Sequence, residues 1–200
     1  MLYIVRHGQT DWNLENRIQG SVDISLNETG RVHAHDVAQK LQNFKIQKIV
    51  SSDLSRASET AKIIGGHLNM AVDYDARLRE YDFGRLTGMY RAGIEPEMVE
   101  AFFSNPTEFE AEHMKDAFTR VRSFFDTVDY NKNTLIVTHG GIINFMMCYM
   151  EDKNTFRNHS FLDKCLHSHI GNAAILRIKD MESGISMLRN TRFFRLPQSK

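Results

Sequence analysis

The stretch "LYIVRHGQTDWN", from Leu2 to Asn13, joins an apolar run to a polar loop. Its first four residues, Leu2 to Val5, are aliphatic or aromatic, which predicts a short buried β-strand. Arg6 and His7 follow at once. Charged side chains are poor core residues, but they suit the end of a strand in an α/β sheet, where ligands bind. The stretch therefore predicts an α/β fold whose first strand delivers polar groups into a crevice.

Strand and helix patterns alternate along the rest of the chain. Further strands are expected at 45–52, 70–75 and 133–138, with two more within 172–178 and 184–190. Helices are expected after Asn27, from Asp53, after Pro96, over 114–128 and after His139. This alternation predicts a three-layer α/β/α sandwich with a largely parallel central sheet. We expect residues 1–200 to form a single domain, with a lid-like insertion at about 81–111, where the periodicity weakens.

Five charged or ionisable residues follow the carboxyl ends of the predicted strands. They are Arg6, His7, Arg56, Glu80 and His139. In a parallel sheet these strand ends lie on the same side, so the five side chains should converge. A helix that begins near Gly140 would add backbone N–H donors for an anion.

This combination of residue types suits phosphoryl transfer. Arginine binds phosphate oxygens through paired, charge-assisted hydrogen bonds. A neutral histidine can attack phosphorus and carry the group covalently, and nearby positive charge keeps that histidine unprotonated. A glutamate can protonate the departing alkoxide and later take a proton from water. The set is sufficient for the reaction without a metal, and we expect no cofactor.

Four segments resemble the signature of the phosphoglycerate mutase-like histidine phosphatases. They are "RHGQTDWN", "SSDLSRASETA", "LREYDFG" and "VTHGG", and they occur in that family's order. The resemblance implies the family's fold and a phosphohistidine on His7. It also implies that Glu80 is the proton donor and that Asn13 contacts the phosphate.

Together, the residue pattern and the resemblance define a candidate site. The predicted catalytic residues are His7, Glu80, Arg6, Arg56 and His139. The predicted substrate-binding residues are Arg6, Asn13, Arg56, His139 and Gly140. No metal ligands are predicted.

The chain departs from the family pattern in the part that would cover the substrate. The family's Phe-Gly-x-Trp-Glu-Gly is Phe-Gly-Arg-Leu-Thr-Gly at 83–88, and its Gly-Glu-Ser is Ala-Glu-His at 111–113. The covering segment is also short compared with that of the mutases. The substrate is therefore left open among phosphoglycerate, sugar phosphates and α-ribazole phosphate. Arg85 or Arg91 in this segment could bind a second anionic group, or both could belong to a solvated charged loop.

Four functions compete on these residues. The leading hypothesis is a metal-independent phosphatase that hydrolyses a small phosphate monoester. A mutase would return the phosphoryl group to a second hydroxyl, but a short cover that admits water favours hydrolysis. A non-catalytic phospho-ligand sensor would not need both His7 and Glu80. A metallohydrolase with His7, Glu80 and His139 as ligands is disfavoured, because neighbouring arginines would oppose a dication.

The composition restricts the classes of molecule that the protein is expected to bind. The chain has 25 Lys and Arg residues and 25 Asp and Glu residues, which argues against binding to nucleic acid or to a membrane surface. The longest apolar stretch, 141–150, is too short to span a bilayer, and the N-terminal pattern is not that of a signal peptide. We therefore expect a cytoplasmic protein whose partner is a small-molecule phosphate ester. A homodimer is left open.

Overall fold

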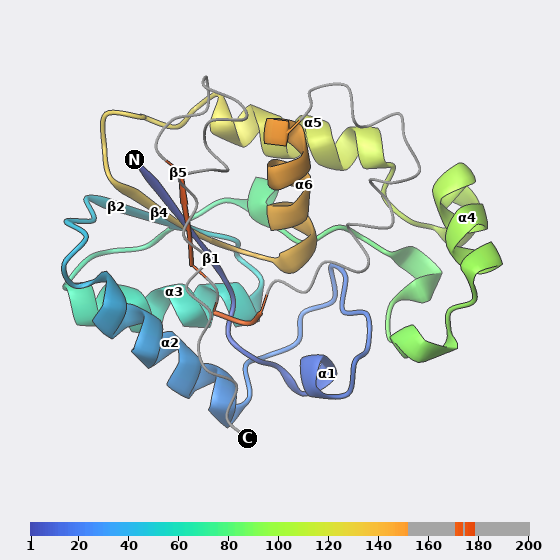
Figure 1. The fold of residues 1–200 in the computed structure, drawn as a ribbon, viewed down its shortest axis with the longest axis horizontal. Helices are drawn as coiled ribbons and strands as arrows, with labels where there is room; N and C mark the ends of the chain where they lie inside the picture. The colour runs from blue at the N-terminus through green and yellow to red at the C-terminus, as the bar shows by residue number, and fades with distance from the viewer. Residues whose placement is uncertain (152–170, 174, 179–200) are drawn as a thin grey trace.

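A five-stranded sheet lies at the centre of the molecule (Figure 1). The computed structural model describes residues 1–151, 171–173 and 175–178, and in it the strand order is β3-β2-β4-β1-β5. The strands are β1 (Leu2–Arg6), β2 (Lys48–Ser51), β3 (Asp73–Tyr74), β4 (Thr134–Thr138) and β5 (Ile175–Ile178). The first four are parallel to one another, whereas β5 pairs antiparallel with β1. The expected largely parallel sheet is confirmed; the further strand expected at 184–190 lies outside the described residues.

Helices cover both faces of this sheet. The α-helices are α1 (Asp11–Leu14), α2 (Glu28–Leu41), α3 (Ser55–Leu68), α4 (Pro96–Ser104), α5 (Met114–Phe125) and α6 (Gly140–Glu151). Short 3-10 turns are η1 (Ala76–Leu78), η2 (Gly84–Leu86), η3 (Arg91–Gly93) and η4 (Pro106–Phe109). Figure 1 shows α2 and α3 on one side of the sheet and α5 and α6 on the other. The three-layer arrangement is therefore confirmed.

The alternation of side chains along β1 explains why both faces are covered. Leu2 and Ile4 belong to one buried cluster, which includes apolar residues of α5 and α6. Tyr3 and Val5 belong to a second cluster, which includes apolar residues of α2 and α3. Successive strand residues point to opposite faces, so a continuously apolar strand needs a layer on each side. Each such buried side chain stabilises the fold by about 1.5–3 kcal/mol before entropy is counted.

Helix α3 begins later than the sequence predicted. Asp53 does not open it; Leu54 occupies the N-cap and makes no side-chain capping bond. Instead, the side chain of Asp23 accepts a bond from the Ser55 N–H at 2.6 Å and one from the Ser55 hydroxyl at 2.7 Å. The carboxylate of Asp53 is paired with Arg79 at 2.7 Å. A distant loop therefore satisfies the helix terminus that a local cap was expected to satisfy.

Strand β3 is shorter than the expected run over 70–75. Asn69 ends α3 in the left-handed conformation, and the N–H of Met70 donates to the carbonyl of Gly65 at 2.8 Å. The N–H of Met70 therefore closes the end of α3 and is not available to pair with β2. Only Asp73 and Tyr74 pair with β2, and both are exposed at the sheet edge.

The segment expected to form an insertion contains η2, η3, α4 and η4. Phe102 of α4 is fully buried, and Phe83 and Phe109 pack against the same cluster. Gly84 has a φ of +49°, and a Cβ there would lie 2.0 Å from the carbonyl oxygen of Phe109. The segment is thus joined to the core by aromatic packing and by one close backbone approach that requires glycine.

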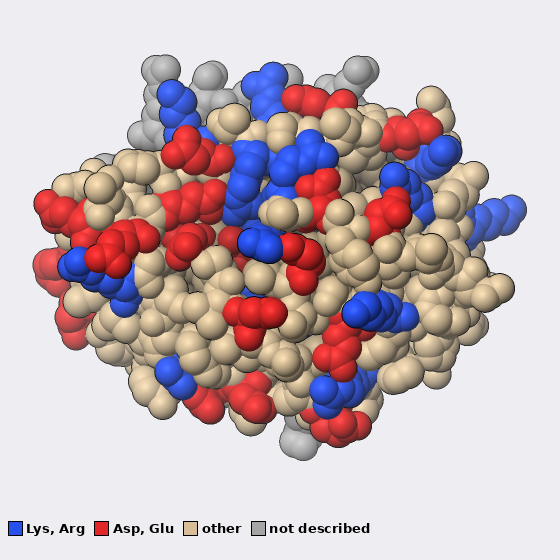
Figure 2. Space-filling view, turned by 180° about the vertical axis from the view of Figure 1, so that it is seen from behind, with Lys and Arg blue, Asp and Glu red and all other residues tan. Residues whose placement is uncertain are grey.

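The surface reflects the balanced charge of the chain. Figure 2 shows basic and acidic side chains interleaved over the face it presents. Among the described residues, no helix has both the length and the apolar character needed to cross a bilayer.

Candidate active site

The predicted site residues converge at the carboxyl ends of the parallel strands. The imidazole rings of His7 and His139 have centroids 5.2 Å apart. The carboxylate of Glu80 accepts a bond from the N–H of Gly141, two residues after His139. A Cβ on Gly140 would lie 3.3 Å from Nε of Arg6, which shows how closely that side chain passes the start of α6.

The hydrogen bonding of His7 fixes its tautomer. Nδ1 lies 2.7 Å from the backbone carbonyl of Gly8. A carbonyl oxygen only accepts, so Nδ1 carries the hydrogen and Nε2 keeps its lone pair. Burial lowers the pKa of His7 well below its usual range, and the charges of Arg56 and Arg6 lower it further. His7 is therefore a neutral imidazole at pH 7, with an unprotonated Nε2.

His139 is held by Ser52, whose role the sequence pattern did not indicate. Its Nε2 lies 2.8 Å from the hydroxyl of Ser52, and that hydroxyl accepts a bond from the N–H of Leu54. Burial lowers the pKa of His139 well below its usual range, and the charge of Arg56 adds to this. Ser52 directly follows β2, so the ends of β2 and β4 meet at this contact.

Arg6 and Arg56, the two arginines of the predicted site, remain charged near neutral pH. Burial lowers the pKa of Arg6 and of Arg56 to about 10 in each case, and the negative charge of Glu80 opposes the shift. Arg56 is fully buried, and its two terminal nitrogens donate to the carbonyls of Val22 and Gly20 at 2.7 Å. Arg56 lies in the first turn of α3, and these bonds fix its guanidinium against the loop that contains Gly20 and Val22.

Glu80 follows η1 and points at the start of α6. Its Oε1 accepts from the N–H of Tyr81 at 3.0 Å, and its Oε2 accepts from the N–H of Gly141 at 3.0 Å. A Cβ on Gly141 would lie 2.5 Å from Oε1, so the carboxylate occupies the space that a side chain would fill. The N-terminus of α6 was expected to offer its N–H groups to an anion, but this one is used by Glu80.

Asn13 lies in α1, beside the loop that carries His7. Its Oδ1 accepts from the Thr10 N–H, the Thr10 hydroxyl and Nδ2 of Asn172. The same Nδ2 lies 3.3 and 3.1 Å from the carbonyls of His7 and Gly8. Three donors on Oδ1 orient the amide and leave its NH2 group as the part that can bind an anion. Asn172 was missed, since its only signal in the sequence is an asparagine before a strand.

The two arginines weighed as second anion sites differ. Arg85 forms an exposed ion pair with Glu110 at 2.7 Å. The charge of Arg91 contributes to lowering the pKa of Arg6, so Arg91 lies within electrostatic range of the predicted site.

The assembled site can receive an anion beside a nucleophile. Two guanidinium groups supply positive charge, a neutral imidazole supplies a lone pair, and a carboxylate can exchange a proton. Within the described residues, no three His, Cys, Asp or Glu side chains are grouped so that they could hold a metal ion.

Comparisons with known proteins show which proteins this chain resembles. Phosphoglycerate mutase-like protein 4 of Arabidopsis thaliana is 38% identical over 156 residues, covering 71% of this chain and 67% of the relative. Probable phosphoglycerate mutase GpmB of Yersinia pestis is 37% identical over 148 residues, covering 70% and 69%. A mycobacterial glucosyl-3-phosphoglycerate phosphatase, solved as complexes with VO3, has a TM-score of 0.71 at 30% identity, covering 88% of this chain and 90% of that one.

The family assignment covers most of the sequence. The histidine phosphatase superfamily (branch 1) matches residues 2–183, a range that contains every predicted site residue. The resemblance inferred from the four sequence segments is thereby confirmed, and the chain belongs to the histidine phosphatase superfamily (branch 1).

Proposed function

We propose that the protein is a metal-independent phosphatase that hydrolyses a small phosphate monoester through a phosphohistidine on His7. The observation that carries the proposal is the bond from Nδ1 of His7 to the Gly8 carbonyl, which leaves Nε2 as a lone-pair donor. A depressed pKa keeps this nitrogen unprotonated near neutrality. Membership of the superfamily and the similarity to a mycobacterial phosphatase support the same chemistry.

The first step is phosphoryl transfer to the enzyme. The phosphate binds between Arg6, Arg56 and His139, whose donors neutralise charge on its oxygens. Nε2 of His7 attacks phosphorus, the N–P bond forms, and the ester P–O bond breaks. Glu80 reacts in this step as the protonated acid: its carboxyl gives a proton to the departing alkoxide, which leaves as an alcohol, and Glu80 becomes the carboxylate.

The second step regenerates the enzyme. Water attacks phosphorus and gives a proton to the carboxylate of Glu80, while the N–P bond breaks. Inorganic phosphate leaves, and both His7 and Glu80 return to their starting protonation states. The roles of acid and base fall to one carboxyl because water enters where the alcohol departed.

Hydrolysis of p-nitrophenyl phosphate in excess EDTA tests the proposal. We expect turnover by the native chain, an acid-labile phosphoryl label on the protein, and inhibition by vanadate. His7→Ala should abolish the turnover and the label. His35→Ala, which changes an exposed histidine of α2, should keep both. Activity that EDTA removes, or a label that survives in His7→Ala, would contradict the mechanism.

A mutase is the second candidate, because two of the relatives carry phosphoglycerate mutase names. It would use the same phosphohistidine but return the group to another hydroxyl of the bound substrate. Isomerisation of 3-phosphoglycerate, measured beside release of inorganic phosphate from it, separates the two. Isomerisation that exceeds release would favour the mutase.

Within the proposed reaction, Arg91 is the candidate for a second anionic group on the substrate. We expect Arg91→Met to lower kcat/KM for phosphoglycerate about 10-fold or more, with little change for p-nitrophenyl phosphate, because only the former carries a carboxylate. Arg85→Met serves as the matched control, since that guanidinium is paired with Glu110. An equal loss on both substrates would argue against this role for Arg91.

A further inference from the structure

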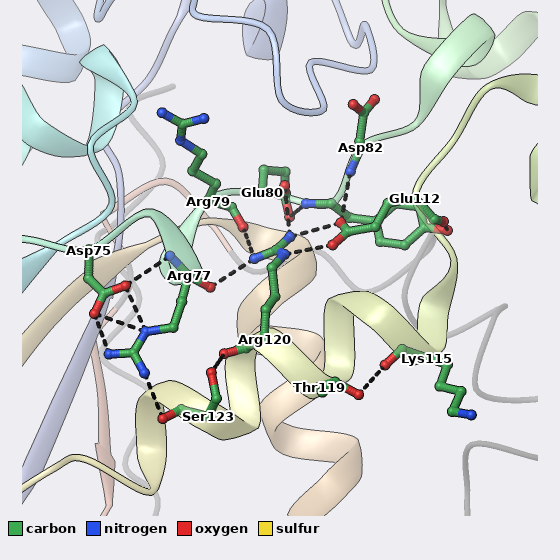
Figure 3. Close-up of polar contacts among 11 residues, drawn as sticks. Asp75, Arg77, Arg79, Glu80, Asp82, Glu112, Lys115, Thr119, Arg120 and Ser123 are labelled. Carbon is green, nitrogen blue, oxygen red and sulfur yellow. Dashed lines mark hydrogen bonds and ion pairs between the residues drawn. The ribbon is translucent and has the colours of Figure 1, made fainter.

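Arg120 of α5 uses all five of its N–H donors within one small region (Figure 3). Nη1 donates to the carbonyls of Arg77 and Arg79, both at 2.8 Å, and Nη2 donates to the carbonyl of Glu80 at 3.2 Å. Nε and Nη2 donate to the two carboxylate oxygens of Glu112 at 2.6 and 2.9 Å. A single guanidinium therefore binds three carbonyls of the segment that presents Glu80.

Glu112 holds the other side of the same segment. Its N–H donates to the carbonyl of Asp82 at 3.0 Å, and its carboxylate accepts from the N–H of Asp82 at 3.4 Å. The hydroxyl of Tyr81 donates to its carbonyl. The side chains of Glu112 and Arg120 are 18% and 22% exposed, so water screens their ion pair less than it screens a surface pair.

Arg120 and Glu112 thus bind the backbone both before and after Glu80. The carboxylate end of Glu80 is fixed separately by the N–H groups of Tyr81 and Gly141. The charge of Arg120 also contributes to lowering the pKa of His139, which places it within electrostatic range of the site. We propose that Arg120 and Glu112 form a positioning pair that sets where Glu80 delivers its proton. The inference rests on the proposed function of Glu80 as the acid.

A positioning role and a merely structural role predict different kinetics. An alkoxide is a strong base and leaves only as it is protonated, whereas p-nitrophenolate is a weak base that leaves without help. Displacing Glu80 by a fraction of an ångström should therefore slow transfer from an alkyl ester far more than transfer from the aryl ester. A general loss of folded protein would slow both equally.

The experiment measures single-turnover formation of phosphohistidine from β-glycerophosphate and from p-nitrophenyl phosphate. Glu80→Gln provides the reference for a lost acid. We expect Arg120→Met and Glu112→Gln to lower the alkyl-to-aryl rate ratio about 10-fold or more, with KM for each ester little changed. Arg120→Lys should not restore the ratio, because an ammonium cannot bind three carbonyls and a carboxylate in this planar arrangement.

Arg77→Met is the matched control. Arg77 also joins the segment before Glu80 to α5, because its Nη1 donates to the carbonyl of Ser123 at 2.7 Å. Its guanidinium pairs with Asp75 of its own segment, and it does not bind the carbonyls of Arg79 and Glu80 (Figure 3). It should lower stability while leaving the ratio unchanged. If Arg120→Met fails to fold, Glu112→Gln and Arg120→Lys carry the test.

The outcomes separate the inference from the proposed function. If Glu80→Gln leaves the ratio unchanged, the role of Glu80 as acid fails. If Glu80→Gln lowers the ratio but Arg120→Lys and Glu112→Gln do not, only the positioning role fails. An equal change in Arg77→Met would also overturn it, because any loosening of α5 would then suffice.

Discussion

Gly141 illustrates how one missing side chain shapes the site. A Cβ at this position would lie 2.5 Å from Oε1 of Glu80, so Gly141→Ala should push the carboxylate away and weaken its bond from the Gly141 N–H. We expect kcat for an alkyl phosphate to fall about 10- to 100-fold, within the range of general acid catalysis. Steady-state kinetics on β-glycerophosphate measure this.

Gly66→Ala is the control for that substitution. A Cβ on Gly66, inside α3, would meet no atom within 4 Å. The change should leave activity intact and stabilise the helix by about 0.5–1 kcal/mol. Equal rates for the two alanine variants would mean that the Glu80 carboxylate tolerates displacement.

Other residue-scale features show what the sequence could and could not predict. The placement of His7 and His139 at strand ends could be predicted, because each directly follows a strand, β1 or β4, whose apolar pattern is local. The role of Ser52 beside His139 could not, because residues 87 positions apart form that contact. A Cβ on Gly8, in the loop that carries His7, would lie 2.3 Å from the carbonyl oxygen of Gly30, and no feature of the sequence indicates this close approach. Contacts of this kind join segments that are far apart in the sequence, so they depend on the complete fold and cannot be predicted from local patterns.

At the scale of elements, the start of α3 shows the same division. Periodicity predicts that a helix exists, but its terminus depends on Asp23, which accepts two bonds from Ser55. Asp23→Ala should lower the free energy of unfolding by about 1 kcal/mol, the usual cost of a lost cap. Asp23→Asn, which keeps one side-chain oxygen as acceptor, should lose less. Urea unfolding measures both, and equal stability of Asp23→Ala and the native chain would show that the cap contributes nothing.

The element scale also bears on Arg56, an arginine proposed to bind phosphate. Arg56 lies one residue after Ser55, and it donates to the carbonyls of Gly20 and Val22, on the loop that carries Asp23. The loop and the helix start therefore hold each other through bonds in both directions. Accordingly, the loop that caps α3 also orients the guanidinium proposed to bind phosphate.

For the whole molecule, assembly of the site has an electrostatic cost that pH should reveal. Folding buries His7 and His139 beside two arginines, and burial lowers both of their pKa values well below the usual range. Below about pH 6.5 the unfolded chain binds protons at these histidines that the folded chain does not bind. Stability should therefore fall as the pH drops below this value, by about 1.4 kcal/mol per pH unit for each histidine, and become independent of both above it.

Urea unfolding between pH 5 and 8 tests this cost, with His7→Gln and His139→Gln compared with the native chain. Glutamine does not titrate, so each variant should lose about 1.4 kcal/mol per pH unit less than the native chain on the acid side. The curves should run parallel above pH 7. Parallel curves over the entire range would mean that the two histidines already bind protons in the folded protein. In that case the pKa of His7 would be the same in the folded and unfolded chain, and burial beside Arg6 and Arg56 would not be what keeps its imidazole neutral.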